Sequence, residues 1–190
     1  MGSLLSKEFP LDHWAVLNTK RVFDAGKRIQ VSKQMVRLPD SRVVDDYYQV
    51  ELPSFATIYA VNEANQVLLL RQYKHGVGDV CLTLPGGQIE KGEDPEFSAR
   101  REMLEETGYG GGRWYTGPTL VLHGNQRIAH AHVFVARHVI KLGEASSGDL
   151  EDTVLTTMSP SEVRTAIQTG LMPVTSHVAT AGIADMILSQ

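Results

Sequence analysis

The sequence predicts an α/β fold, with a small antiparallel β subdomain ahead of the main domain. Three observations predict it: several short β-like pieces within residues 1–50, apolar runs of strand length after them, and two stretches with strong helix-start signals in residues 51–190. At 190 residues, with 42% apolar and 21% charged residues, the chain has the size and composition of one soluble globular domain with a small appendage.

The first 50 residues are expected to form a β subdomain. They contain short β-like pieces at 14–17, 28–31 and 35–38. A hairpin-type turn is expected at 24–27 and a second loop at 38–41. The remaining chain, residues 51–190, is expected to be the main domain.

The main domain carries strand and helix patterns in turn. Strands are predicted at 55–61, 67–73, 118–122 and 130–136. Ser159 and Glu162 have the spacing of a capping box, with Pro160 as first helical residue, and that helix should stop near Gly170. A last helix is predicted from about Thr175–Ser176, with an apolar side made of Val178, Ile183, Met186 and Ile187.

Composition limits the classes of function. A net charge of −4 argues against a surface that wraps nucleic acid. The single cysteine, Cys81, cannot form an internal disulfide and is expected to be a small buried residue. The N-terminus lacks the apolar stretch of a signal peptide and no segment has the length of a membrane span, so we expect a cytoplasmic protein.

The most informative stretch runs from Gly87 to Tyr109. Asp94 and Gly108 are expected to cap a helix that begins at Pro95. On this helix, three carboxylates share one face: they belong to Glu102, Glu105 and Glu106. Phe97 and Leu104 fall on the opposite face, which is expected to meet the core.

Three neighbouring carboxylates repel one another, at about 0.2–0.5 kcal/mol per pair. A solvated acidic face is one interpretation, and a site for a hard divalent cation such as Mg²⁺ is the other. The surrounding pattern favours the cation site. It fixes nine positions over twenty-three residues: Gly87, Glu93, Arg101, Glu102, Met103, Glu105, Glu106, Gly108 and Tyr109.

This pattern resembles the Nudix box, with every constrained position filled. The resemblance implies a Nudix α/β/α sandwich with a mixed sheet, and Mg²⁺-dependent hydrolysis of a nucleoside diphosphate linked to another moiety, with Mn²⁺ as a substitute. It implies metal ligation by Glu102 and Glu106, assisted by Glu105 and by the backbone carbonyl of Gly86. Glu93 and Arg101 are expected to pair and hold the loop on the helix.

The group that accepts the proton of the attacking water is left open. By resemblance it is a glutamate on the loop after the box, where Glu151 is favoured, Asp149 is second, and Glu144 and Asp152 also lie. Glu105 is the alternative base, and Arg101 is also kept among the catalytic candidates. Most of these loop carboxylates are equally explained as surface residues.

A second, shorter resemblance is to the ADP-ribose and nucleoside diphosphate sugar pyrophosphatase branch of the family. It rests on Gln72-Tyr73-Lys74 and on Leu84-Pro85-Gly86-Gly87. Arg71 and Lys74 are the candidates for contact with substrate phosphates. Trp14 is expected either to stack on the base or to pack in a homodimer interface, since relatives use the N-terminal piece for both purposes.

Two features depart from that branch. No second tryptophan stands near residues 28–36, and residues 122–127 carry His-Gly-Asn where the branch tends to have Ser-Pro-Gly. His130 and His132 alternate along a strand and are expected to be structural rather than metal ligands. From the resemblance to this branch, the expected substrate is ADP-ribose or a nucleotide sugar, split into a nucleoside monophosphate and a sugar phosphate. The alternatives are GDP-mannose, NADH, a dinucleoside polyphosphate, or a sensing module without activity.

Overall fold

The computed structural model describes residues 12–146, 148 and 152–189. Its contacts divide the chain into two compact units. The first comprises the chain up to Leu52 together with His123–Ile128, and the second comprises Pro53–Leu122 and Ala129 onwards. Each unit is described by itself below.

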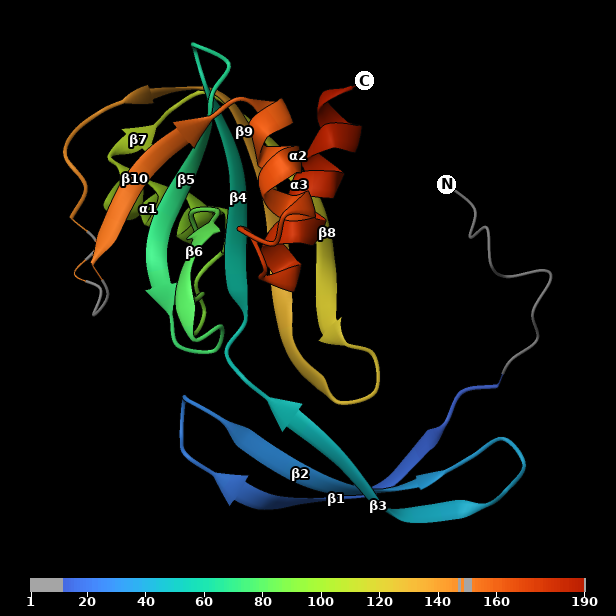
Figure 1. The fold of residues 1–190 in the computed structure, drawn as a ribbon. Helices are drawn as coiled ribbons and strands as arrows, with labels where there is room; N and C mark the ends of the chain where they lie inside the picture. The colour runs from blue at the N-terminus through green and yellow to red at the C-terminus, as the bar shows by residue number, and fades with distance from the viewer. Residues whose placement is uncertain (1–11, 147, 149–151, 190) are drawn as a thin grey trace. The chain divides into compact units, whose positions relative to one another are not determined.

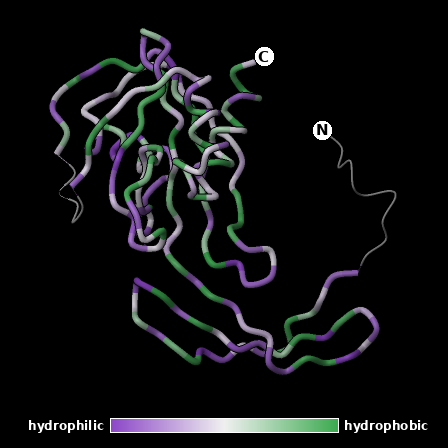
Figure 2. The backbone as a smooth tube through the Cα atoms, in the orientation of Figure 1, coloured by the Kyte–Doolittle hydropathy of each residue, from purple (hydrophilic) through white to green (hydrophobic). Residues whose placement is uncertain are grey.

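The first unit is an antiparallel sheet of β1 (Ala15–Asp24), β2 (Gln30–Arg37) and β3 (Val43–Glu51). The turn after β1 lies where the sequence predicts it, and there the Gly26 N–H donates to Asp24 Oδ1 at 2.7 Å. The pieces predicted at 28–31 and 35–38 form one strand, with a register shift between Gln34 and Val36. The sequence analysis missed β3, where apolar and charged residues are mixed (Figure 2).

Among the described residues, the second unit holds seven strands and three helices (Figure 1), although the last residue of β8 and the first two of β9 belong to the first unit. The strands are β4 (Phe55–Asn62), β5 (Val67–Lys74), β6 (Asp79–Thr83), β7 (Tyr109–Gly110), β8 (Arg113–His123), β9 (Arg127–Lys141) and β10 (Thr153–Met158). The helices are α1 (Pro95–Thr107), α2 (Pro160–Gln168) and α3 (Thr175–Leu188). The predicted strands at 118–122 and 130–136 are the central parts of β8 and β9, whereas β6, β7 and β10 were not predicted.

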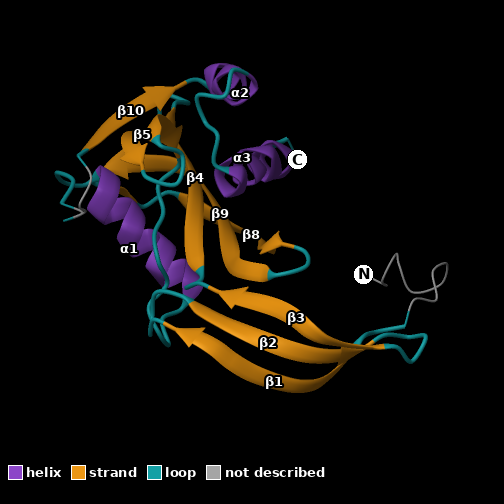
Figure 3. Ribbon diagram, turned by 60° about the horizontal axis from the view of Figure 1, so that its bottom comes forward, coloured by secondary structure: helices purple, strands orange, loops and turns teal. Residues whose placement is uncertain are grey.

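The sheet of the second unit is mixed, as expected. β4 pairs with β9 in parallel, and β5 pairs antiparallel with β4, β6 and β10. β7 and β8 pair with β9. Helix α1 covers one face of this sheet, and α2 and α3 cover the other (Figure 3). The predicted α/β sandwich is therefore confirmed.

Two core assignments from the sequence are wrong. Phe97 and Leu104 of α1 are 62% and 44% exposed, and the helix instead packs through Ala99 and Met103, which are fully buried. Met186 of α3 is 70% exposed, because that helix packs mainly through small residues such as Ala181 and Ala184. In both helices a close approach to the sheet selects the side chains that fit, not the most apolar ones.

Two further expectations concern Cys81 and the membrane. Cys81 is buried in β6, as predicted. Within the part of the chain that is described, every helix is too short or too polar to cross a membrane.

Candidate active site

Helix α1 has the boundaries that the sequence predicts. Asp94 Oδ1 accepts hydrogen bonds from the N–H groups of Glu96 and Phe97, both at 3.0 Å. At the other end Gly108 takes a left-handed conformation with φ 72°, and its N–H donates to Leu104 O at 2.8 Å. These two caps fix which turn of the helix carries each glutamate.

The turn before the helix, at Gly86 and Gly87, is held on β4. The Ala56 N–H donates to Gly87 O, and the Ile58 N–H donates to Pro85 O, each at 2.9 Å. Gly86 has φ 153°, and a Cβ at this residue would overlap the carbonyl oxygen of Ala56. Only glycine therefore fits at Gly86 without moving the strand.

The structure brings two of the glutamates onto this turn. The Gly86 N–H donates to Glu106 Oε2 at 2.7 Å. The carboxylate of Glu102 occupies the space where Gly87 would carry a Cβ. The carboxylates of Glu102 and Glu106 thus lie close to the backbone of the glycine turn.

Arg101 links the carboxylates to the preceding loop. Its Nε donates to Glu93 Oε1 at 3.0 Å, which confirms the predicted pair. Its Nη1 contacts Glu102 Oε1 at 2.8 Å and Glu105 Oε2 at 3.0 Å. Hydrogen bonding by Arg101 lowers the pKa of Glu93 to about 2, with a further contribution from the Glu90 N–H.

The donor set fits a hard divalent cation by its chemistry. Three carboxylates and a backbone carbonyl, those of Glu102, Glu105, Glu106 and Gly86, are oxygen ligands of the type that Mg²⁺ and Mn²⁺ take. The absence of a Cβ on Gly87 leaves the Glu102 carboxylate close to the turn. As the side chains stand, no three His, Cys, Asp or Glu residues among those described are grouped as a metal site.

The candidate phosphate-binding cations both lie on β5. Arg71 is exposed and stands opposite Leu82 of β6 and Val154 of β10. Lys74 ends the strand and is half-buried. Because they are three positions apart in a strand, their side chains leave β5 on opposite faces.

The loop carboxylates are only partly described. Glu144 pairs with Lys141 at 2.9 Å and its side chain is 88% exposed, and Asp152 is exposed too. Asp149 and the favoured candidate Glu151 lie outside the described residues. The Ser146 N–H donates to Glu105 O at 2.7 Å, so the start of this loop is attached to the box helix.

Trp14, in the first unit, is 52% exposed. It meets Tyr47 edge-on, with ring centroids 5.5 Å apart, and the Tyr47 hydroxyl donates to Asn125 O at 3.1 Å. One side of the indole is thus supported while much of it stays accessible, which is compatible with either expected role.

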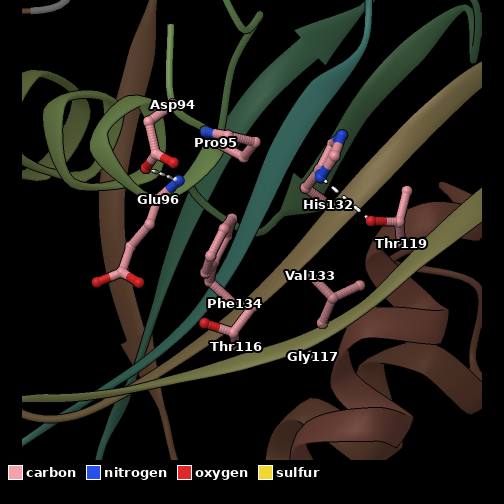
Figure 4. A pocket seen from close by; sticks show the side chains of 9 residues that line it. All are labelled: Asp94, Pro95, Glu96, Thr116, Gly117, Thr119, His132, Val133 and Phe134. Atoms are coloured by element: carbon pink, nitrogen blue, oxygen red, sulfur yellow. Dashed lines mark hydrogen bonds between the residues drawn. The ribbon is translucent and has the colours of Figure 1, made fainter.

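A hollow of about 230 Å³ lies beside the first turn of α1, between that helix and strands β8 and β9 (Figure 4). Inside it, Thr119 Oγ1 lies 3.2 Å from Nδ1 of His132. Burial, and then the neighbouring His130, lower the pKa of His132. A neutral imidazole hydrogen-bonded to a threonine matches the structural role expected for it.

The sequence analysis missed His177. Its Nδ1 accepts the Leu84 N–H at 2.8 Å and so holds the residue that leads into Pro85 and the glycine turn. Burial lowers the pKa of His177 to about 4, helped by the charge of Lys74. The contact joins residues 93 positions apart, and no local pattern in the sequence indicates it.

Comparison with known proteins agrees with this geometry. The model of the NUDIX domain matches residues 51–177. An ADP-ribose pyrophosphatase of Bacillus subtilis is 29% identical over 136 residues, which cover 68% of this chain and 70% of that protein. An ADP-sugar pyrophosphatase of Mus musculus is 51% identical over 45 residues, or 24% of this chain and 21% of that one.

A solved structure shares the fold. The crystal structure of an ADP compounds hydrolase superposes with a TM-score of 0.81 at 16% identity, over 96% of this chain and 97% of that one. The family model covers well over half of the chain, including the glycine turn and the whole of α1. The chain belongs to the NUDIX family of hydrolases.

Proposed function

We propose that the protein is a Mg²⁺-dependent pyrophosphatase that hydrolyses ADP-ribose or nucleoside diphosphate sugars to a nucleoside monophosphate and a sugar phosphate. One observation carries the proposal: Glu102 and Glu106 meet the Gly86–Gly87 turn, where α1 and β4 hold them together. Intact box carboxylates in this arrangement favour an enzyme over a sensing module.

The cation would be held by Glu102 and Glu106, with Glu105 and the Gly86 carbonyl. When bound, it neutralises phosphate charge and lowers the pKa of a coordinated water. The protein's own part is to fix the carboxylates. Arg101 orients Glu102 and Glu105 through one Nη1 atom and is itself fixed by Glu93.

The proton of the attacking water goes to a carboxylate. Glu151 is the first candidate for this base and Glu105 the second. The Glu105 side chain is 42% exposed, so its carboxylate is accessible to a water molecule while Arg101 holds its position. Replacing each by glutamine, singly, distinguishes them: the true base loses kcat with little change in metal affinity.

Arg71 and Lys74 are the proposed phosphate contacts, and Trp14 the proposed base contact. We further propose a homodimer formed through the first unit, whose strands expose large apolar side chains (Val16, Leu17, Val22, Phe23 and Met35). Light scattering after gel filtration tests the dimer. We also propose that the protein is cytoplasmic.

The names of the relatives support the substrate class without fixing the substrate. Besides the ADP-ribose and ADP-sugar pyrophosphatases, the chain matches a putative 8-oxo-dGTP diphosphatase of Bacillus subtilis at 43% identity over 54 residues. The lack of a tryptophan near residues 28–36 also favours a tolerant base pocket. Other nucleoside diphosphate derivatives are therefore the second candidates.

A substrate panel tests the proposal. ADP-ribose, ADP-glucose, GDP-mannose, UDP-glucose, NADH, diadenosine polyphosphates and 8-oxo-dGTP are incubated with Mg²⁺ or Mn²⁺, and a coupled phosphatase reports monoester products. We expect turnover of ADP-ribose or nucleotide sugars, abolished in a variant with both Glu105→Gln and Glu106→Gln that remains folded. Activity that survives this double change would refute the site, and silence across the panel would favour a sensing module.

A further inference from the structure

A second cavity, of about 240 Å³, lies between α2, α3 and β4. It is on the face of the sheet opposite α1, so it is separate from the carboxylates of the box helix. Its walls are mostly apolar, from Val163 and Ile167 of α2 and from Val178 and Ala181 of α3. The proposed hydrolysis does not use it.

Tyr59 of β4 supplies the most buried polar side chain of this cavity, which Arg164, Gln168 and Asp185 also line. The residue is only 2% exposed, yet its hydroxyl makes no hydrogen bond to any other residue that the structure describes. Among the described side chains, no polar atom is both sealed from solvent and without a partner. The Tyr59 hydroxyl is therefore reachable, and the cavity that Tyr59 lines is the route to it.

The charges at this cavity balance each other. Arg164 Nη1 lies 3.1 Å from Asp185 Oδ2, and both side chains are about half exposed. Burial and the charge of Asp185 raise the pKa of Tyr59 to about 12, so its hydroxyl keeps its proton and stays a donor. Because the two charges already neutralise each other, neither is left over to attract a charged ligand, and an uncharged ligand would leave the pair intact.

We propose that this cavity binds a small uncharged molecule that has an apolar body about the size of one aromatic ring and one hydrogen-bond acceptor. The body would lie against the valine, isoleucine and alanine side chains, where burial of apolar surface favours binding. The acceptor, a carbonyl or hydroxyl oxygen, takes the proton of Tyr59. Among the described residues none accepts a hydrogen bond from that hydroxyl, so a ligand oxygen would not compete with a protein partner there.

A pair of matched probes tests the site on the full chain. Acetophenone carries a carbonyl oxygen, and α-methylstyrene has a similar size and shape with a CH₂ in place of that oxygen. Methyl resonances of Val163, Ile167 and Val178 are followed by NMR during titration with each probe. We expect both probes to shift these methyls, with acetophenone binding roughly 5-fold more tightly, the effect of one hydrogen bond.

Two variants make the test specific. Tyr59→Phe removes only the hydroxyl, so the fold should persist and the preference for acetophenone should vanish. Tyr47→Phe is the matched control, because that tyrosine lies in the first unit with its hydroxyl on Asn125 O. It should leave the preference unchanged.

Filling the cavity provides an independent arm. Gly182 lines it, and a Cβ there would meet no atom within 4 Å, so Gly182→Leu should fold and weaken both probes. The proposal is refuted if neither probe shifts the methyls, if the preference survives Tyr59→Phe, or if the shifts map to another part of the molecule. None of these results depends on hydrolytic activity, so failure here leaves the proposed enzyme untouched.

Discussion

Glu106 and Gly86 are joined by a hydrogen bond of 2.7 Å, from the glycine N–H to the carboxylate, although they lie twenty residues apart in the chain. Glu106 is 8% exposed, and no other charged residue in the described part of the chain is as buried. A carboxylate in such a place is costly unless it is partnered, and here the Gly86 N–H is one partner.

Replacing this carboxylate by an amide should separate activity from stability. In Glu106→Gln the side-chain oxygen still accepts the Gly86 N–H, so we expect the melting temperature to change by only a few degrees. Loss of the charge should lower Mg²⁺-dependent hydrolysis at least about 100-fold. Activity against ADP-ribose, measured beside a thermal melt, checks both expectations.

Glu96→Gln is the matched control on the same helix. That carboxylate pairs with Arg100 at the surface, so its loss should leave activity unchanged. Equal effects of the two changes would mean that Glu106 has no special role.

Gly87→Ala should act on the site through crowding. The new methyl group would take the space of the Glu102 carboxylate, which is the end of a flexible side chain and can move away. We therefore expect a folded protein with weakened metal dependence, seen as a higher Mg²⁺ concentration for half-maximal rate.

Gly86→Ala provides the contrast, because its methyl group would meet the backbone of Ala56, which cannot move without disturbing β4. This variant should lose stability as well as activity. If Gly87→Ala kept the wild-type Mg²⁺ requirement, the placement of Glu102 as a ligand would be wrong.

The Arg101–Glu93 pair should be visible by titration. The pKa of Glu93 is about 2, below the ordinary 4.5, so the pair's stabilising effect is complete above pH 4.5 and is lost as the pH falls towards 2. Arg101 contacts Glu93 at two points, Nε to Oε1 at 3.0 Å and Nη2 to Oε2 at 3.2 Å. Arg101→Lys cannot reproduce both contacts, and we expect the pKa of Glu93 to rise towards 4.5. Carboxyl-carbon NMR measures it directly, and an unchanged pKa in the variant would show that another group holds Glu93.

His177 should make stability depend on pH. Its pKa is 6.5 when unfolded and about 4 when folded, so only the unfolded chain takes up a proton between these values. The free energy of unfolding should fall as pH drops from 6.5 to 4, by up to about 3 kcal/mol. Urea unfolding at several pH values tests this.

His177→Asn keeps an acceptor for the Leu84 N–H but does not titrate. The variant should lose most of the slope below pH 6.5. If the slope survived this change, another group would be its cause.

The helix boundaries were predictable because caps are local. Asp94 and Ser159 hydrogen-bond to N–H groups two or three residues ahead, so the signals lie within a few positions. The direction in which α1 packs was not predictable in that way. On a helical wheel, Phe97 and Leu104 form an apolar pair opposite the glutamates. The residues that pack against the sheet are instead Ala99 and Met103, which lie on the same side of the helix as Glu106.

That arrangement follows from the chemistry of the site. Glu106 must reach the glycine turn on β4, so the buried face of α1 has to include it. The strands that were missed, β3, β6, β7 and β10, are mixed or short. β3 and β6 each pair with the strand just before them, whereas β10 pairs with β5, far away in sequence. His177 was missed for the same reason, since its partner Leu84 precedes it by 93 residues.

The small unit is not continuous in the chain, and this matters for anyone who wants to excise it. Val50 and Glu51 of β3 pair with Arg127 and Ile128, and Arg127 also forms an ion pair with Glu51. A cut after Leu52 would therefore remove the strand that residues 123–128 pair with and leave their backbone groups unmatched. A minimal catalytic fragment would need a shorter turn in place of residues 123–128. Insertions between β8 and β9 would first disturb the pairing of these residues with the N-terminal sheet.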